Sequence, residues 1–224
     1  MPTEHGKQMN NLIRGAKQPA TTGQDKADEI RGYYKQGLQQ IRGDRHMHAD
    51  RRRVEIAQLY ATTQAALKQV RDQQAKTDRE TFAKLERQLW GYDDVRATAP
   101  DRATTDTAIR DAQDRAAKLT KPEQAARALA EAEQAGDTVL ARAIAHQAHQ
   151  RDWDDVVGDY LSTRPTAAER YQQAGEIYLR NNTPAGAVSH SFIGSLGKPE
   201  ELRGLDDKTI QSMADPQDTG PTAA

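Results

Sequence analysis

Two histidines, His146 and His149, lie three residues apart in an alanine-rich segment that is predicted to be helical. This spacing places both imidazoles on one face of a helix, as a zinc site requires. No third ligand follows at the spacing of a known motif, and Gln147 and Ala148 between them offer no general base. We therefore expect neither a metal site nor a cofactor.

The residue types of nucleophilic catalysis occur side by side at Ser189, His190 and Ser191. Adjacent residues rarely provide a working nucleophile and base, and no glycine-framed elbow surrounds these three. The phosphate-binding patterns GxxxxGK[ST] and GxGxxG do not occur. Paired carboxylates such as Asp93 and Asp94 fall at expected linkers or helix starts, where capping explains them. The sequence thus predicts no catalytic residues and a protein that is not an enzyme.

A group of five arginines is the strongest candidate for contacts with a partner or with phosphate. The group consists of Arg42, Arg45, Arg51, Arg52 and Arg53. Arginine binds carboxylate or phosphate bidentately, so such a group can serve a protein or a nucleic acid. Acidic residues dilute its charge and no stacking aromatics are interleaved. We favour a solvated or intersubunit ion-paired face, with nucleic-acid binding as the alternative.

Composition argues against one thick core. The chain has 224 residues, of which 36% are hydrophobic and 29% charged, and its formal net charge is -1. Residues 1–100 carry 18 Lys and Arg against 13 Asp and Glu, and the remainder carries 14 against 20. Without cysteine, disulfides and thiolate metal sites are excluded. No run of 18 apolar residues occurs, so we expect no membrane contact and a soluble, unprocessed chain.

The elements that must position these residues begin with a long helix. Residues 44–90 contain no glycine or proline and are rich in Arg, Gln, Glu, Lys and Ala, and a helix of that length would reach roughly 70 Å. Apolar residues from Leu59 to Leu89 recur at steps of three and four, which is typical of one helix face. Polar residues interrupt this face, so an autonomous coiled-coil dimer is not favoured. Gly91 is expected to end the helix with a left-handed cap.

Short helices follow, and their ends carry capping signals. Thr120 with Glu123 forms a predicted capping box, Gly136 can close that helix, and Asp137 can cap the next one. We expect a compact hairpin stack in which Trp153 fills a large gap in the core. The predicted core residues are Leu119, Leu129, Leu140, Ile144, Trp153, Val157, Tyr160, Leu161, Tyr171 and Ile177.

The fold class predicted from these signals is all-α. It consists of a long N-terminal helix, a small bundle of short antiparallel helices, and extended N- and C-terminal arms. The expected parts are a flexible arm at 1–23, a long charged helix at 24–91 that is broken or weak before 44, a linker at 92–100, the helical stack at 101–182, and an extended C-terminal arm at 183–224 with a possible short helix. The possible arm contacts are Val188, Phe192, Ile193 and Leu196.

Three segments carry a resemblance to a known group of proteins: LERQLWG at residues 85–91, RDAQDRAAKL at 110–119, and the helical run from PEQAARAL to WDDVVGDYL at 122–161. Together they resemble uncharacterised helical proteins encoded among the virion structural genes of actinobacterial phages and prophages. The resemblance implies a role in head, head–tail connector or tail assembly. It implies no catalytic residues.

The function we expect is therefore that of a non-enzymatic structural or interaction protein of a virion, present in the host cytoplasm during assembly. Its partners would be other virion proteins and copies of itself, contacted through the long helix and the arms, with no small-molecule substrate. One alternative is a scaffolding or assembly-chaperone protein that is absent from the mature particle. A second is a nucleic-acid-associated helical protein.

Overall fold

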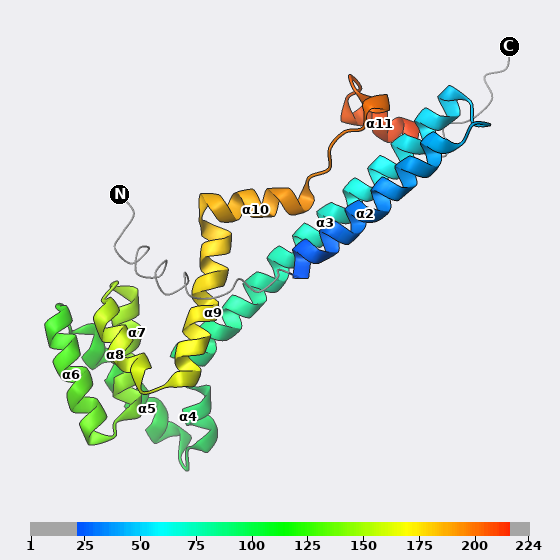
Figure 1. The fold of residues 1–224 in the computed structure, drawn as a ribbon. Helices are drawn as coiled ribbons and strands as arrows, with labels where there is room; N and C mark the ends of the chain where they lie inside the picture. Colours follow the sequence, from blue (N-terminus) through cyan, green and yellow to red (C-terminus); the bar gives the residue numbers. More distant parts are fainter. Residues whose placement is uncertain (1–21, 216–224) are drawn as a thin grey trace. The chain divides into compact units, whose positions relative to one another are not determined.

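Every regular element in the described part of the chain is helical. The computed structural model describes residues 22–215, without the side chains of Thr22, Ala185, Ser189 and His190. The elements are α2 (Thr22–Gly43), α3 (Ala49–Trp90), α4 (Asp93–Thr98), α5 (Arg102–Ala117), α6 (Pro122–Ala135), α7 (Thr138–Gln150), α8 (Asp154–Ser162), α9 (Pro165–Asn182), α10 (Pro184–Gly194), the 3-10 helix η1 (Glu200–Leu202) and α11 (Asp207–Ala214) (Figure 1). The all-α prediction is confirmed.

The predicted long N-terminal helix is not confirmed. The first described helix is the 22-residue α2, and the 42-residue α3 follows it. The predicted arm at residues 1–23 lies outside the described residues except for its last two. Among the described residues, unit 1 comprises residues 78–179, and unit 2 comprises residues 22–77 and 180–215. Both α3 and α9 contribute residues to each unit.

In unit 2, α2 packs along the first part of α3 (Figure 1). Tyr34 and Leu38 of α2 share a buried cluster with Ile56, Ala57 and Tyr60 of α3. Of the two predicted alternatives, a weak helix or two short ones, the structure has a single helix, since α2 runs unbroken through its internal glycines. At Gly37, an added Cβ would lie 2.9 Å from Leu59 Cδ2, so the missing side chain lets the helices approach. This packing outweighs the roughly 1 kcal/mol by which a glycine weakens a helix.

The long helix starts later than the composition of the chain suggests, at Ala49. The Asp44 carboxylate accepts a hydrogen bond from the backbone N–H of His46 at 2.8 Å, as in an Asx turn. Arg52 Nη2 donates to the carbonyl oxygens of Asp44 at 2.7 Å and Met47 at 3.1 Å. These bonds satisfy backbone groups in the turn between α2 and α3.

Residues 183–215 do not form the predicted extended arm. They fold into α10, η1 and α11, and Leu202 and Ile210 are buried with Tyr34, Ile56 and Tyr60. The short helix expected near the C-terminus is confirmed as α11, where the Asp206 side chain accepts from the N–H of Thr209 at 2.7 Å. Part of the long helix is therefore covered by the chain's own C-terminal segment.

Unit 1 is built around α7, which contacts α5, α6 and α8. Six buried residues of α7, four of them alanine, allow neighbouring helices to approach closely: Leu140, Ala141, Ala143, Ile144, Ala145 and Ala148. The cap predictions for this helix are confirmed, since the Asp137 side chain accepts from Leu140 N at 2.9 Å. Gly136 has a φ of 68°, which is the left-handed cap that favours glycine.

Three other local predictions are wrong. The linker predicted at 92–100 contains α4. The capping box predicted from Thr120 and Glu123 does not form, because α6 begins after Lys121 without a side-chain cap and Thr120 contacts Gln124 instead. Gly91 does not adopt a positive φ. An added Cβ there would lie 2.3 Å from Arg87 O, so glycine is needed for close approach to the backbone.

The core of unit 1 contains the predicted residues, but its central tryptophan is a different one. Six of the ten predicted residues are buried, and Leu119, Trp153, Leu161 and Tyr171 are partly buried against the same cluster. Trp90, at the end of α3, is only 5% exposed. Trp153 instead precedes α8 and lies beneath the guanidinium of Arg151, 5.4 Å from the ring centroid.

Replacing Trp90 by alanine should lower the free energy of unfolding by about 3–5 kcal/mol, because it leaves a cavity among the packed helices. Trp153→Ala removes the same group from a partly exposed position and should cost distinctly less. Urea unfolding of both variants, followed by far-UV circular dichroism, measures the difference. Equal losses would contradict the central position of Trp90.

Candidate functional site

The two histidines at metal-ligand spacing do lie on one face of α7, where their rings pack against the indole of Trp90. The ring centroids of His146 and His149 are 5.5 and 5.3 Å from that of Trp90, at interplanar angles of 15° and 20°. Both contacts are stacked. The described residues contain no group of three or more His, Cys, Asp or Glu arranged to hold a metal. The spacing thus serves aromatic packing here.

Tyr171 of α9 completes this cluster. Its ring meets Trp90 edge-on, with centroids 6.2 Å apart, and its hydroxyl lies 3.2 Å from His149 Nδ1. Burial, together with the nearby carboxylates of Asp154, Asp152 and Glu86, raises the pKa of Tyr171 to about 12. The hydroxyl therefore stays protonated at neutral pH and can donate to the imidazole. A general acid or base works best with a pKa near the operating pH, whereas the pKa of Tyr171 is moved further away from neutral pH.

The five arginines of the candidate contact surface lie in unit 2, and most of them bind groups of the same chain. Arg42 makes a bidentate ion pair with Glu201, at 2.7 and 2.8 Å. Arg53 Nε donates to the Glu201 carbonyl at 3.0 Å, and Arg51 pairs with Glu55 at 2.5 Å. Arg52 binds the turn before α3, and Arg45 is exposed. Internal pairing leaves little of this cluster for nucleic acid.

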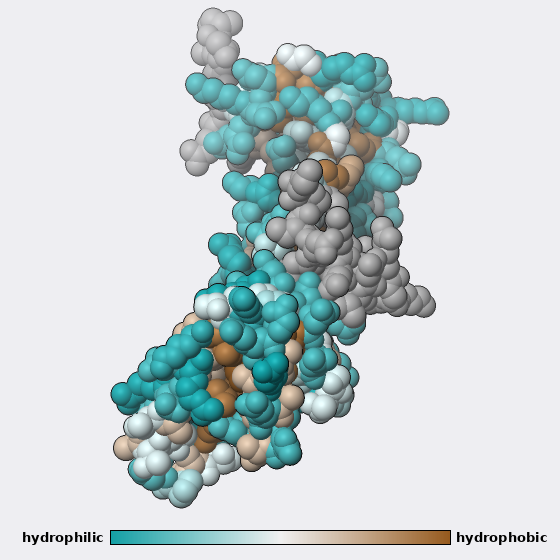
Figure 2. Space-filling view, turned by 90° about the vertical axis from the view of Figure 1, so that its left-hand side faces the viewer, coloured by the Kyte–Doolittle hydropathy of each residue, from teal (hydrophilic) through white to brown (hydrophobic). Residues whose placement is uncertain are grey.

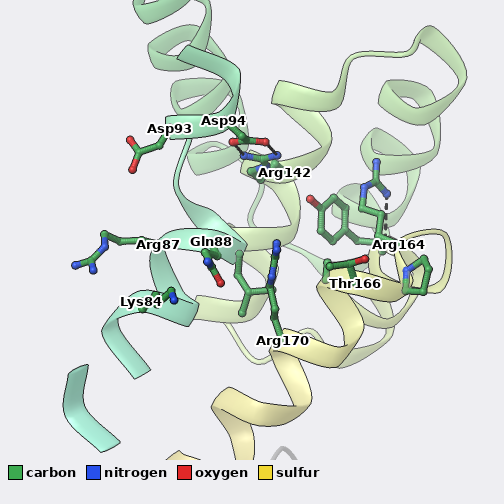
Figure 3. Close-up of a pocket in the computed structure, with 13 residues that line it drawn as sticks. Lys84, Arg87, Gln88, Asp93, Asp94, Arg142, Arg164, Thr166 and Arg170 are labelled. Carbon is green, nitrogen blue, oxygen red and sulfur yellow. Dashed lines mark hydrogen bonds and ion pairs between the residues drawn. The ribbon is translucent and has the colours of Figure 1, made fainter. Parts of the chain in front are cut away.

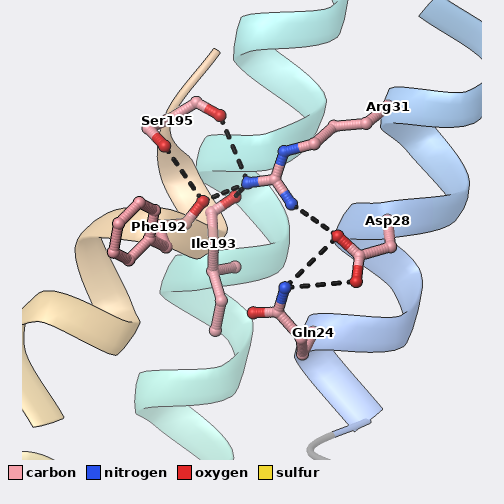
Figure 4. Close-up of polar contacts among 6 residues, drawn as sticks. All are labelled: Gln24, Asp28, Arg31, Phe192, Ile193 and Ser195. Carbon is pink, nitrogen blue, oxygen red and sulfur yellow. Dashed lines mark hydrogen bonds and ion pairs between the residues drawn. The ribbon is translucent and has the colours of Figure 1, made fainter.

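A different arginine, Arg31 of α2, fastens the end of α10 (Figure 4). Its Nη2 donates to the carbonyl oxygens of Phe192, Ile193 and Ser195, the latter two at 3.2 Å each. Its Nη1 lies 2.9 Å from Asp28 Oδ1. The last carbonyls of a helix lack intrahelical partners and carry partial negative charge, so a guanidinium stabilises them. Arg31 thus anchors α10 to α2.

This anchoring separates the four predicted arm contacts into two groups. Ile193 is buried with Ala27 and Leu67, and Leu196 is partly buried between the two clusters of unit 2. Val188 and Phe192 remain 53% and 61% exposed. They are one helical turn apart on α10 and therefore lie on one face. On the face that Figure 2 shows, the described residues are mostly hydrophilic, with hydrophobic residues in limited patches.

Unit 1 carries a pocket of about 610 Å³ lined by α3, α4, α7, α8 and α9 (Figure 3). Its lining includes five cationic side chains, Lys84, Arg87, Arg142, Arg164 and Arg170, and two carboxylates, those of Asp93 and Asp94. Figure 3 shows Arg170 rising from α9 into the middle of the lining, whereas Arg87 points toward its rim. The pocket therefore has an excess of positive charge.

Two of the pocket arginines already have acidic partners. Arg142 binds Asp94 bidentately, at 2.6 and 2.8 Å, and also donates to the Gly91 carbonyl at 2.6 Å. This hydrogen bonding lowers the pKa of Asp94 and keeps it charged. Arg164 pairs with Glu133 at 2.8 Å and lies 4.1 Å from the centroid of the Tyr160 ring. These two arginines link helices of unit 1.

Sequence reasoning missed several of these residues. Trp90 is the last residue of the predicted long helix, where no local pattern marks it as part of a core. Neither Arg31 nor Arg170 belongs to a local pattern that distinguishes it from other charged residues of a helix surface. The side chains of Ser189 and His190 lie outside the described residues. None of the described helices combines the length and apolar composition that crossing a membrane requires.

Comparison with known proteins adds no relative. No protein-family model, curated protein or solved structure matches this chain significantly.

The stacked His146 should make unit 1 sensitive to pH. Burial lowers the pKa of His146 from its usual value of 6.5, so the unfolded chain binds this proton at higher pH than the folded chain does. Above pH 6.5 the imidazole is neutral in both the folded and the unfolded chain. As the pH falls below 6.5, the free energy of unfolding decreases until the pH reaches the pKa of the folded state. In urea unfolding between pH 8 and pH 5, the free energy of unfolding of His146→Gln should therefore decrease less than that of the wild type.

His46→Gln is the matched control, since it replaces an exposed histidine in the turn between α2 and α3. It should keep the wild-type pH dependence. A His146→Gln protein that declines as steeply as the wild type would contradict the role of this ring.

Proposed function

We propose that this chain is a non-enzymatic structural protein of a phage virion that binds a neighbouring virion protein through the exposed face of α10. The virion assignment is supported by the resemblance of residues 85–91, 110–119 and 122–161 to helical proteins of phage structural gene blocks. The binding mode is supported by Val188 and Phe192, which form an apolar pair on an anchored helix.

Single exposed apolar residues are common and need no explanation. Here two large ones lie on the same face, next to a fully packed residue, Ile193, which is 3% exposed. Because Arg31 holds the end of α10, this face is presented without the ordering cost that a free arm would incur on binding. Aromatic side chains such as Phe192 are enriched at the centre of protein interfaces. The expected partner surface is an apolar groove or helix face.

The internal pairing of the arginines weighs against the nucleic-acid alternative. Arg42 and Arg53 both bind Glu201, and Arg51 binds Glu55, so phosphate binding would require these contacts to break.

The scaffolding alternative differs from the proposed function in whether the protein is present in the mature particle. Mass spectrometry of purified mature particles tests this point, because a scaffold would be present in precursor particles and missing from mature ones.

Photo-crosslinking tests the proposed contact directly. A benzophenone amino acid at position 192, introduced in cells producing particles, should crosslink to one virion protein. The same group at Tyr33, which is 65% exposed on α2, serves as the control and should give no such product. Crosslinks from both positions, or from neither, would contradict a specific α10 interface.

Substitutions on α10 should separate binding from folding. Phe192→Ala should change the free energy of unfolding by no more than about 0.5 kcal/mol, because the side chain is exposed. It should nevertheless reduce incorporation of the chain into particles. Ile193→Ala removes a buried side chain and should cost about 2–5 kcal/mol. Loss of stability in the Phe192 variant comparable to that of the Ile193 variant would refute the assignment of this face.

A further inference from the structure

The pocket of unit 1 contains more positive charge than its own residues neutralise. Arg142 and Arg164 are paired with Asp94 and Glu133. Within the described part of the chain, Lys84, Arg87 and Arg170 make no ion pair, and Asp93 pairs at 3.6 Å with Arg96, which lies outside the lining. Three cations of the pocket are thus left for an external anion.

Arg170 is the most informative of these cations. It is half-buried, and Figure 3 shows its side chain rising from α9 among the other lining residues. A guanidinium that lines a pocket together with other cations favours the binding of an anion there. Gln88 and Thr166, which also line the pocket, supply an amide and a hydroxyl that can donate to an anion's oxygen atoms.

We infer that this pocket binds a small phosphorylated anion. Arginine matches the geometry of phosphate oxygens bidentately, and three unpaired cations suit a ligand with several negative charges better than a single carboxylate does. The volume of about 610 Å³ lies within the range of small-molecule sites. The paired Arg142 and Arg164 form a fixed wall, while Arg170 contacts the phosphate. This inference does not depend on the proposed virion role.

Titration calorimetry with sodium tripolyphosphate, on the full chain at low ionic strength, tests the site. We expect saturable binding to one site per chain, weakened at least about tenfold by Arg170→Gln, because a charge-assisted contact is lost. Arg87→Gln, at the rim, should also weaken binding, but less. Arg127→Gln makes the same charge change on the exposed surface of α6, outside the pocket, and should alter the affinity less than about twofold.

Two results would overturn the inference. One is non-saturable binding, or an equal loss for the Arg127 and Arg170 variants, since either would reflect general charge attraction. The other concerns competition for the site. If a single-stranded oligonucleotide displaces tripolyphosphate at a lower concentration, counted in phosphate groups, than inorganic pyrophosphate does, the preferred ligand is a nucleic-acid backbone. Displacement by pyrophosphate first, with melting temperatures of the variants close to the wild type, supports a small-anion site.

Discussion

The indole of Trp90 is the contact on which unit 1 depends. It lies at the end of α3 and packs against the two histidines of α7, Tyr160 of α8 and Tyr171 of α9. The chain has few large apolar residues, and nine of the other 18 buried residues of this cluster are alanine. Alanines allow close approach of helices but bury little area each, so one large aromatic group determines how four helices meet.

The same scarcity of apolar residues explains how unit 2 is stabilised. Its clusters are small, and polar contacts between distant segments accompany them. Arg31 binds the carbonyls at the end of α10, and Arg42 and Arg53 bind Glu201 near η1. Each exposed ion pair contributes little, but several that act on one segment restrict its position. Residues 183–215 are consequently folded against α2 and α3, while Val188 and Phe192 remain exposed on α10.

Charge is used differently in the two units. In unit 2 four of the five clustered arginines bind groups of the same chain, and Arg45 is exposed. In unit 1 the cations come from separate helices and are inconspicuous in the sequence, yet they converge on one pocket. A surplus of charge becomes informative only when the partners of each group are known, because an arginine with a carboxylate partner has little left to offer a ligand.

Local sequence alone determined that the chain is helical and where several helices begin and end. Asp137, Gly136 and Asp206 act within one turn of their own position, so their caps are predictable without knowledge of the fold. Which tryptophan is central, and which carboxylate each arginine binds, was decided by the tertiary structure. Arg42 and Glu201 are 159 residues apart, and no local pattern relates them. The physical reason is range: capping satisfies backbone groups nearby, whereas burial and ion pairing depend on which helices pack together.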